Sequence, residues 1–222
     1  MKRVLIVGAS RGIGLELVRQ YRQAGDAVSA TARGAEGLAR IGALGALALA
    51  LDLAEAGSAA SLASALAGQS FDVVVHNAAV YGPRTQGLQT PSAQEFDSVM
   101  HTNVLGAMRV LAQLPALLAP AARLAVISSR MGSMGLRVSN SGWLYAASKA
   151  ALNSVLKDAS IALAGKAVCV ALHPGWVRTD MGGSGADLDV ATSVADMCRT
   201  LAALTAADNG RFFNHDGQPL AW

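Results

Sequence analysis

The sequence predicts an α/β protein with one doubly wound sheet of about seven mainly parallel strands and with helices on both faces of that sheet. Short apolar runs alternate with longer helical patterns along the whole 222-residue chain. Most of the short runs are continuously apolar, as parallel strands are when helices cover both of their faces. No stretch between them has the composition of a domain linker. We therefore expect a single domain over residues 1–222.

The expected strands are short and rich in Val, Leu, Ile and Ala. In chain order they are Arg3–Val7, Ala27–Ala32, Ala46–Leu51, Asp72–His76, Arg123–Ser128, Ala167–Leu172 and Arg211–Asn214. The expected helices repeat apolar residues at helical spacing. They are Gly12–Ala24, Ala35–Ile41, Ala54–Ala67, Ser92–Leu118, Gly142–Ala164 and Asp189–Ala203. This alternation implies right-handed crossovers, and ligands of such sheets bind beyond the carboxyl ends of the strands.

Composition excludes several classes of protein. Hydrophobic residues make up 52% and charged residues 15%, which fits a large core and argues against disorder. The net charge is only +3 and the basic residues are scattered, so we expect no nucleic-acid partner. No apolar stretch is long enough to cross a membrane, and the run Val4–Val7 is too short for a signal peptide. We expect a cytoplasmic protein.

The two cysteines and four histidines do not suggest a metal site. Cys169 and Cys198 both lie in apolar, periodic segments, so we expect two buried free thiols in a reducing compartment. The histidines are too dispersed to complete a zinc site with them. We expect no metal.

A glycine-rich loop follows the first expected strand and precedes a helix. Its glycines allow a tight turn and let a pyrophosphate approach the helix N-terminus, where free N–H groups and the helix dipole favour anions. The alternative is an ordinary glycine-rich turn, which the strand–loop–helix context disfavours. The loop predicts a Rossmann-type dinucleotide site. The loop residues expected to contact the cofactor are Gly8, Ser10, Arg11, Gly12, Ile13 and Gly14.

Two arginines predict which dinucleotide binds. Arg11 lies in the loop, and Arg33 follows the second strand, where NAD-preferring proteins carry an acidic residue for the ribose hydroxyl. No acidic residue occurs between Asp26 and Glu36. Two guanidinium groups there could hold a 2′-phosphate, although both could also be solvated surface residues. We expect NADPH to be favoured over NADH.

Tyr145 and Lys149 predict acid–base chemistry. Their i, i+4 spacing puts both side chains on one face of a helix. A free phenol has a pKa of about 10, and a neighbouring ammonium lowers that pKa toward the working pH. Ser129 ends the fifth expected strand, so its hydroxyl would emerge at the carboxyl edge of the sheet. Asn103 lies mid-helix although asparagine is a poor helix former.

These residues together resemble the short-chain dehydrogenase/reductase (SDR) family, and the resemblance covers nearly the whole chain in order. It implies a catalytic tetrad of Asn103, Ser129, Tyr145 and Lys149. Within the family the motifs are most similar to the sniffer and C-factor type of carbonyl reductase. The further positions that the resemblance assigns to cofactor contact are Asp52, Leu53, Asn77, Ala78, Ala79, Pro174, Gly175, Val177 and Thr179.

The sequence departs from the family pattern at a few positions. His76 and Ala79 replace the outer residues of the family's Asn-Asn-Ala-Gly motif. Ser129 precedes Tyr145 by 16 positions, more than is usual, so we expect an insertion in Leu136–Ser141. Ser133 competes with Ser129, which keeps the position at the strand end.

The resemblance implies reduction of a carbonyl whose oxygen lies between Ser129 and Tyr145. Tyr145 would donate the proton, Ser129 would stabilise the oxyanion, and Lys149 would hold the nicotinamide ribose and lower the pKa of Tyr145. Asn103 would order a water molecule that connects Lys149 to solvent. His173 is more plausible as a capping group than as an acid–base.

The substrate itself cannot be inferred from these residues. Trp143, Trp176 and Met181 flank the catalytic segments and are expected either in an apolar substrate pocket or in the core. The stretch between Thr179 and Asp189, which forms a lid in the family, is short and glycine-rich. A short lid predicts an open pocket.

Three function classes follow from this pattern. An NADPH-dependent carbonyl reductase acting on a small aldehyde, ketone or quinone-like substrate is the leading hypothesis. A non-enzymatic NADPH-binding regulator on the same fold is the alternative, disfavoured by the complete tetrad. A purely structural or interaction module is opposed by the phosphate loop. The apolar helices Ser92–Leu118 and Gly142–Ala164 predict a homodimer, with a monomer as the alternative.

Overall fold

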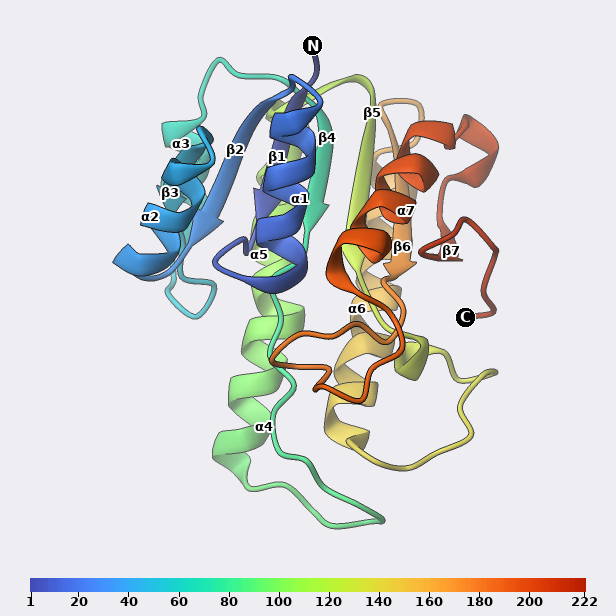
Figure 1. The fold of residues 1–222 in the computed structure, drawn as a ribbon. Coiled ribbons are helices and arrows are strands. Elements are labelled where there is room, and N and C mark those ends of the chain that lie inside the picture. The colour runs from blue at the N-terminus through green and yellow to red at the C-terminus, as the bar shows by residue number, and fades with distance from the viewer.

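The computed structural model describes residues 1–222 and contains one seven-stranded sheet in which every neighbouring pair of strands is parallel. The strand order is β3-β2-β1-β4-β5-β6-β7, which reverses direction between β1 and β4. The predicted fold class is confirmed (Figure 1). The strands are β1 (Arg3–Val7), β2 (Ala27–Ala32), β3 (Leu47–Ala50), β4 (Phe71–His76), β5 (Leu118–Ile127), β6 (Ala167–His173) and β7 (Arg211–Asn214).

The helices alternate with the strands, as expected. They are α1 (Gly12–Gln23), α2 (Ala35–Ala43), α3 (Ser58–Ala65), α4 (Ala93–Met100), α5 (Gly106–Leu111), α6 (Trp143–Ala162) and α7 (Val190–Ala203). Short 3₁₀ turns add η2 (Leu114–Ala116), η3 (Arg130–Gly132) and η4 (Ala206–Asp208), and η1 (His101–Leu105) is a π-helical turn. No helix is both long and apolar enough to cross a membrane.

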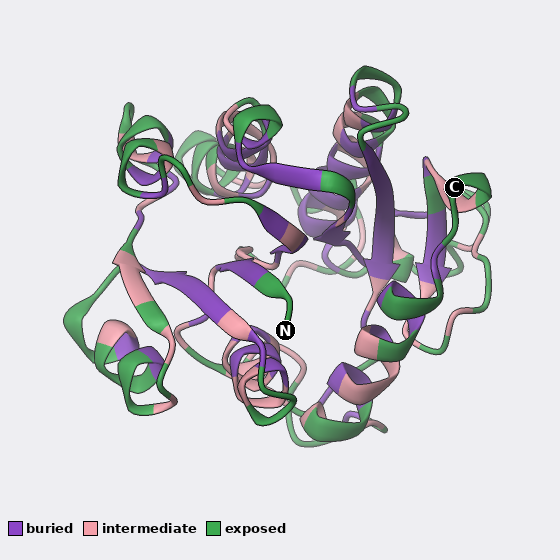
Figure 2. Ribbon diagram, turned by 90° about the horizontal axis from the view of Figure 1, so that it is seen from above, coloured by how far each residue is buried: buried purple, intermediate pink, exposed green.

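Two apolar clusters lie on opposite faces of the sheet. One contains Leu62 of α3, Val110 of α5 and Leu156 of α6, and the other contains Leu17 of α1 and Met197 of α7. Seen from above, the buried strands run between helices on both sides, whose outer surfaces are exposed (Figure 2). Burial of both sheet faces explains why the strand sequences are continuously apolar rather than alternating.

The prediction of one long helix over Ser92–Leu118 is wrong, because the helical stretch is shorter and is interrupted. It ends at Leu111, and β5 already begins at Leu118, before the predicted start at Arg123. Pro115 explains the early end, because proline has no N–H to continue the helical ladder and disfavours helical backbone at the residue before it. The helix is also interrupted by the π-helical turn η1.

The carboxyl ends of the strands converge at one edge of the sheet, which is the lower edge in Figure 1. Helix α4, the beginning of α6 and the loops after β5 and β6 gather there. The reversal of strand order between β1 and β4 makes this edge the expected ligand site of a doubly wound sheet.

Candidate active site

Asn103 is fully buried in the π-helical turn η1 and fastens that turn to the segment after β4. Its side-chain oxygen accepts from the backbone N–H of Val80 at 2.8 Å, and its amide nitrogen donates to the carbonyl of Val80 at 2.8 Å. The amide also donates to Ser148 of α6 at 3.0 Å. Helical turns of the π type are common at functional sites. These contacts, rather than helix propensity, explain why an asparagine occupies this helical position.

Tyr145 and Lys149 lie one turn apart near the start of α6, as predicted, and both are buried. Lys149 Nζ donates to the carbonyl of Ile127, the last residue of β5, at 2.8 Å. Nζ lies 5.6 Å from the centroid of the Tyr145 ring. Gly132 permits this close packing, because a Cβ there would lie 2.8 Å from the backbone of Lys149.

The structure separates the two candidate serines. Ser129 is buried at the end of β5, and its hydroxyl accepts from the N–H of Met131 at 3.1 Å. It lies close enough to Tyr145 to influence the pKa of that phenol. Ser133 instead donates to the carbonyl of Trp222 at 3.1 Å and accepts from the N–H of Leu136. Ser133 is thus a structural residue, and Ser129 is the serine that meets Tyr145.

The electrostatics differ from the expectation that Lys149 lowers the pKa of Tyr145. Burial raises the pKa of Tyr145 above its usual range, Tyr81 raises it further, and the Ser129 hydroxyl opposes the rise. Burial also lowers the pKa of Lys149 to about 7. Desolvation dominates because both groups lie in the interior, where the charged form of either is disfavoured. Tyr145 is therefore protonated at neutral pH.

His76 is buried at the end of β4, and neither of its ring nitrogens has a hydrogen-bond partner in the protein. Burial, and then the neighbouring Lys149, lower the pKa of His76 to about 3. The residue that departs from the family motif is thus a neutral imidazole beside Lys149. His173 is a similar case: burial, and then His215 and Arg130, lower its pKa to about 4.

A tyrosine that the sequence analysis missed stacks on Tyr145. The ring centroids of Tyr81 and Tyr145 are 4.6 Å apart and the planes differ by 20°. Tyr81 lies in the glycine- and proline-rich stretch after β4. An aromatic residue so soon after the strand end was the available signal, because that end lies at the ligand-binding edge.

The glycine loop between β1 and α1 is packed tightly against the end of β4. A Cβ on Gly8, whose φ is +86°, would lie 2.5 Å from the Cβ of Ala78. A Cβ on Gly14 would lie 2.2 Å from the carbonyl oxygen of Gly8, to which Asn77 donates at 2.6 Å. No side chain caps α1, so its first N–H groups remain free for an anion.

Two of the residues that the resemblance assigns to cofactor contact follow the end of β3. Asp52 accepts from the N–H of Ala54 at 3.0 Å, and Leu53 is buried against Gly106 of α5.

The two arginines expected to hold a 2′-phosphate differ in their partners. Arg11 forms an ion pair with Asp180 at 2.7 Å, and both side chains are about 70% exposed. Asp180 belongs to the loop after β6, so the pair joins that loop to the glycine loop. Arg33 is exposed and forms no ion pair. Arg33 is thus unpaired, whereas a phosphate at Arg11 would share the guanidinium with Asp180.

Comparison with known proteins assigns the chain to a family. Residues 2–187 match the family described as short chain dehydrogenase. This chain belongs to the short-chain dehydrogenase family. The C-signal protein of Myxococcus xanthus is 38% identical over 154 residues, which cover 68% of this chain and 92% of that protein.

Solved structures agree with this assignment over the full length of both chains. The carbonyl reductase Sniffer of D. melanogaster has a TM-score of 0.93 and 31% identity, with 100% of each chain covered. A carbonyl reductase from Pseudomonas aeruginosa PAO1 in complex with NADP has a TM-score of 0.90 and 34% identity, again with 100% of each chain covered. The resemblance to the sniffer and C-factor type is thus confirmed, and this short-chain dehydrogenase is an oxidoreductase by family.

In this short-chain dehydrogenase the loop after β6 lies against the glycine loop. A Cβ on Gly12 would lie 3.4 Å from the methyl group of Thr179. The Thr179 hydroxyl accepts from the N–H of Gly182 at 3.1 Å, and Val177 pairs with Leu188 as an isolated bridge. Pro174 accepts from the Ser193 hydroxyl at 2.6 Å. These contacts hold the loop as a compact turn beside the expected cofactor site.

The three residues expected in a substrate pocket have different surroundings. Trp176 is 55% exposed, so it is not a core residue, and its indole N–H donates to the carbonyl of Gly182 at 2.9 Å. Trp143 is partly buried and donates to the carbonyl of Gln89 at 3.0 Å. Met181 is partly buried, and its carbonyl accepts from Arg84 at 2.8 Å. All three lie in segments that meet at the carboxyl edge.

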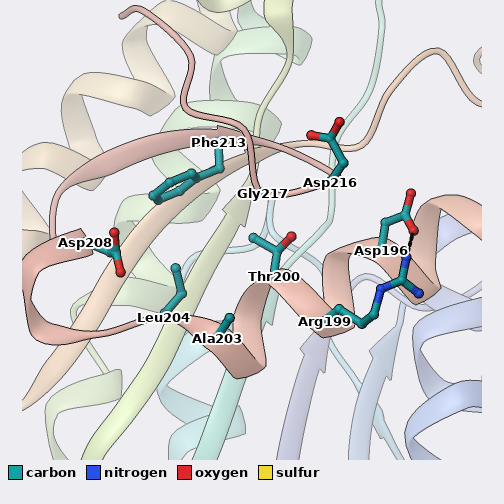
Figure 3. A pocket seen from close by; sticks show the side chains of 9 residues that line it. All are labelled: Asp196, Arg199, Thr200, Ala203, Leu204, Asp208, Phe213, Asp216 and Gly217. Atoms are coloured by element: carbon teal, nitrogen blue, oxygen red, sulfur yellow. Dashed lines mark hydrogen bonds and ion pairs between the residues drawn. The ribbon is translucent and has the colours of Figure 1, made fainter.

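A cavity of about 400 Å³ lies away from these residues, between α7 and the end of the chain (Figure 3). None of the predicted site residues lines it. Asp196 on its wall is paired with Arg199 and with His215, the latter at 2.7 Å. The two cysteines are also outside the site: Cys169 is buried, whereas Cys198 is only partly buried, contrary to expectation.

The residues present fit a dinucleotide. The uncapped N-terminus of α1, the tight contacts of Gly8 and Gly14 and the unpaired Arg33 form a cradle with the partial charges that a phosphorylated ligand requires. The hydroxyls of Ser129 and Tyr145 lie at the same carboxyl edge of the sheet. The residues present therefore fit a dinucleotide at the edge of the sheet that also carries the Ser129 and Tyr145 hydroxyls.

Proposed function

We propose that this short-chain dehydrogenase is an NADPH-dependent carbonyl reductase that converts a small aldehyde, ketone or quinone-like substrate to an alcohol. The observation that carries the proposal is the buried cluster of Ser129, Tyr145 and Lys149 at the carboxyl edge of the sheet, the edge at which the glycine loop also lies. A protein that only binds a dinucleotide has no need of a proton donor there. The structural neighbours named carbonyl reductases, one of them in complex with NADP, support the proposal.

In this proposal each side chain has one task. Ser129 and Tyr145 bind the substrate oxygen. The raised pKa keeps Tyr145 protonated, so the phenol can donate its proton as negative charge develops on that oxygen. Ser129 stabilises the same charge by donating a hydrogen bond. Lys149 lies behind the ring and is placed to hold the ribose of the cofactor. NADPH, when bound, supplies the hydride.

We assign the cofactor as NADPH rather than NADH because of Arg33. This residue occupies the position after β2 where an acidic residue would select NADH, and its guanidinium is exposed. A 2′-phosphate there would gain a charge-assisted hydrogen bond.

The test is turnover, because a regulatory NADPH-binding protein on this fold would bind the cofactor equally well. NADPH oxidation should be measured over a panel of aldehydes, ketones and quinones with the parent protein and with Tyr145→Phe. Removal of one oxygen leaves the ring in place, so NADPH affinity should persist while kcat falls by about 10²–10⁴-fold. Retention of more than about a tenth of the parental kcat would instead favour the regulator.

We also propose that the protein is a homodimer that pairs the α4–α5 and α6 regions across a two-fold axis. Phe96 of α4, Met108 of α5 and Ile161 of α6 are exposed apolar side chains on these elements. A two-fold interface uses the same patch on both subunits. Light scattering should give twice the 22.6 kDa chain mass, and the mass of one chain would refute the dimer.

A further inference from the structure

Tyr81 covers one face of the Tyr145 ring. Its ring is partly buried, whereas Tyr145 is buried, and the two rings are stacked at 4.6 Å. The Tyr145 ring also has Lys149 Nζ at 5.6 Å from its centroid. Offset stacked rings attract each other beyond the effect of burial alone. The orientation of the Tyr145 phenol therefore depends on a residue outside the predicted tetrad.

Arg84 joins this stack to a second loop. Its guanidinium carbon lies 4.9 Å from the centroid of the Tyr81 ring, which is a cation–π distance. The same guanidinium donates to the carbonyl of Met181 at 2.8 Å. One side chain thus contacts both the aromatic stack and the loop after β6. When that loop is in place, Arg84 is held against Tyr81.

The segment that carries Tyr81 is fastened to the beginning of α6. The N–H of Gly142 donates to the carbonyl of Thr85 at 2.9 Å, and the Trp143 indole donates to Gln89 at 3.0 Å. Gly142 is buried, and a Cβ there would lie 2.3 Å from the Tyr81 hydroxyl. The glycine therefore leaves the space that the Tyr81 hydroxyl fills. The segment is seated on the helix that bears Tyr145 and is not a free loop.

We propose that Tyr81 is a positioning residue that fixes the Tyr145 ring and keeps water from its outer face, with Arg84 locking Tyr81 to the loop after β6. The inference rests on the proposed role of Tyr145 as proton donor. The Tyr145 side chain can rotate about its side-chain bonds unless neighbouring groups hold the ring. A displacement of its hydroxyl by about 1 Å can lower the rate about 100-fold. A stacked ring restricts that rotation.

Two kinetic consequences distinguish positioning from a merely structural role. Tyr81→Leu should lower kcat about tenfold, within the range expected for lost orientation, with the NADPH dissociation constant within about twofold of the parent. Water should then reach the phenol and stabilise the phenolate, because burial is what disfavours its charged form. The apparent pKa seen in the pH profile of alcohol oxidation should therefore fall.

The matched variants are Tyr81→Phe, Arg84→Met and Leu88→Ala. Tyr81→Phe keeps the stacked ring and should restore kcat to within about twofold of the parent. Arg84→Met removes the guanidinium and should give a smaller loss than Tyr81→Leu, with no further loss when the two are combined. Leu88 is 80% exposed in the same segment, so Leu88→Ala should leave kcat and the pH profile unchanged.

The proposal is overturned if Tyr81→Leu keeps both the parental kcat and the parental pH profile. It is also overturned if Tyr81→Phe is as impaired as Tyr81→Leu, because the ring would then not be the active element. Thermal unfolding and the NADPH dissociation constant report whether each variant is folded. A parallel Tyr145→Phe measurement separates the two ideas. If Tyr145→Phe is inactive and Tyr81→Leu is normal, only the positioning role fails.

Discussion

Among the candidate catalytic residues, Asn103 and Lys149 are almost completely buried and hydrogen-bonded to backbone, whereas on the proposed phosphate side Arg11 and Arg33 lie in solvent. Asn103 is held by both backbone groups of Val80, and Lys149 by the end of β5. Arg11 has only an exposed ion pair and Arg33 has none. One side of the candidate site is assembled when the chain folds. The other is completed only when a ligand arrives.

The buried and the exposed residues of the site therefore affect different free energies. A buried charge is costly because its desolvation is only partly offset by its partners, and the cost appears in the stability of the fold. An exposed arginine hardly changes the free energy of unfolding, and its contribution appears in ligand affinity instead. Variants of the buried cluster should therefore change stability and rate. Variants of the phosphate side should change cofactor affinity alone.

The largest expected effect is on stability, from Lys149→Met. The pKa of Lys149 is about 7 in the fold, against 10.5 for an ordinary lysine. Between these values the unfolded chain binds the extra proton, so the stability of the parent rises with pH over this window. Below about pH 7 the full penalty is present. Each pKa unit corresponds to about 1.4 kcal/mol, so relief of this penalty in Lys149→Met should exceed the cost of about 1–3 kcal/mol for leaving the Ile127 carbonyl without its donor, and the fold should be more stable there.

Urea unfolding at several pH values between about 6 and 10 measures this gain. The gain should shrink as the pH rises toward the ordinary lysine value. The exposed Lys157 provides the control, and Lys157→Met should not alter the pH dependence. Parallel stability curves for the parent and Lys149→Met would show that Lys149 carries no desolvation penalty.

A smaller effect is expected from Arg33→Ala, and it should appear only in binding. Loss of a charge-assisted contact to the 2′-phosphate costs about 1.5–3 kcal/mol, or about ten- to a hundredfold in NADPH affinity. NADH affinity and the free energy of unfolding should not change, because Arg33 has no partner in the protein. Calorimetric titration with both cofactors measures this. Arg40 pairs with Glu36 on α2, so the control variant Arg40→Ala should leave the affinity for NADPH unchanged. Equal affinities of the parent for NADPH and NADH would refute the cofactor assignment.

The smallest effect is expected from Asp180→Asn, which releases Arg11. An exposed ion pair contributes at most about 1 kcal/mol, so NADPH affinity should rise by no more than about fivefold and NADH affinity should stay the same. High salt should abolish the difference, because it screens the pair. Asp187→Asn in the same loop is the control. A loss of NADPH affinity in Asp180→Asn would mean that Asp180 positions Arg11 for the phosphate.

Sequence patterns predicted the sheet well because each strand is buried on both faces. The bounds of β1, β2 and β7 are confirmed to the residue. Ser129, Tyr145 and Lys149 lie close together because a strand end positions Ser129 and the start of α6 positions the other two. The pKa of Tyr145 was misjudged because spacing reports proximity to Lys149 but not desolvation.

Contacts between distant loops could not be predicted in the same way. Arg11 and Asp180 are 169 positions apart, and no periodic pattern links them. Tyr81 lies in an irregular segment, where neither helical nor strand spacing indicates which way a side chain points. The end of the helix after Asn103 was misplaced because apolar spacing outweighed Pro115 in the prediction.

The π-helical turn at His101–Leu105 constrains the number of residues in this segment as well as their identity. A regular α-helix turns by about 100° per residue, and the wider π turn accommodates one extra residue while α4 and α5 stay in nearly the same angular register. Deletion of one residue here would restore regular winding, with Ala107 and Val110 still facing the sheet, but it would remove the wide turn that holds Asn103 against Val80. Insertion of a further residue would rotate Ala107 and Val110 by about 100° away from the sheet. Length variation among natural relatives should therefore be absent here and concentrated in exposed stretches such as Leu136–Ser141.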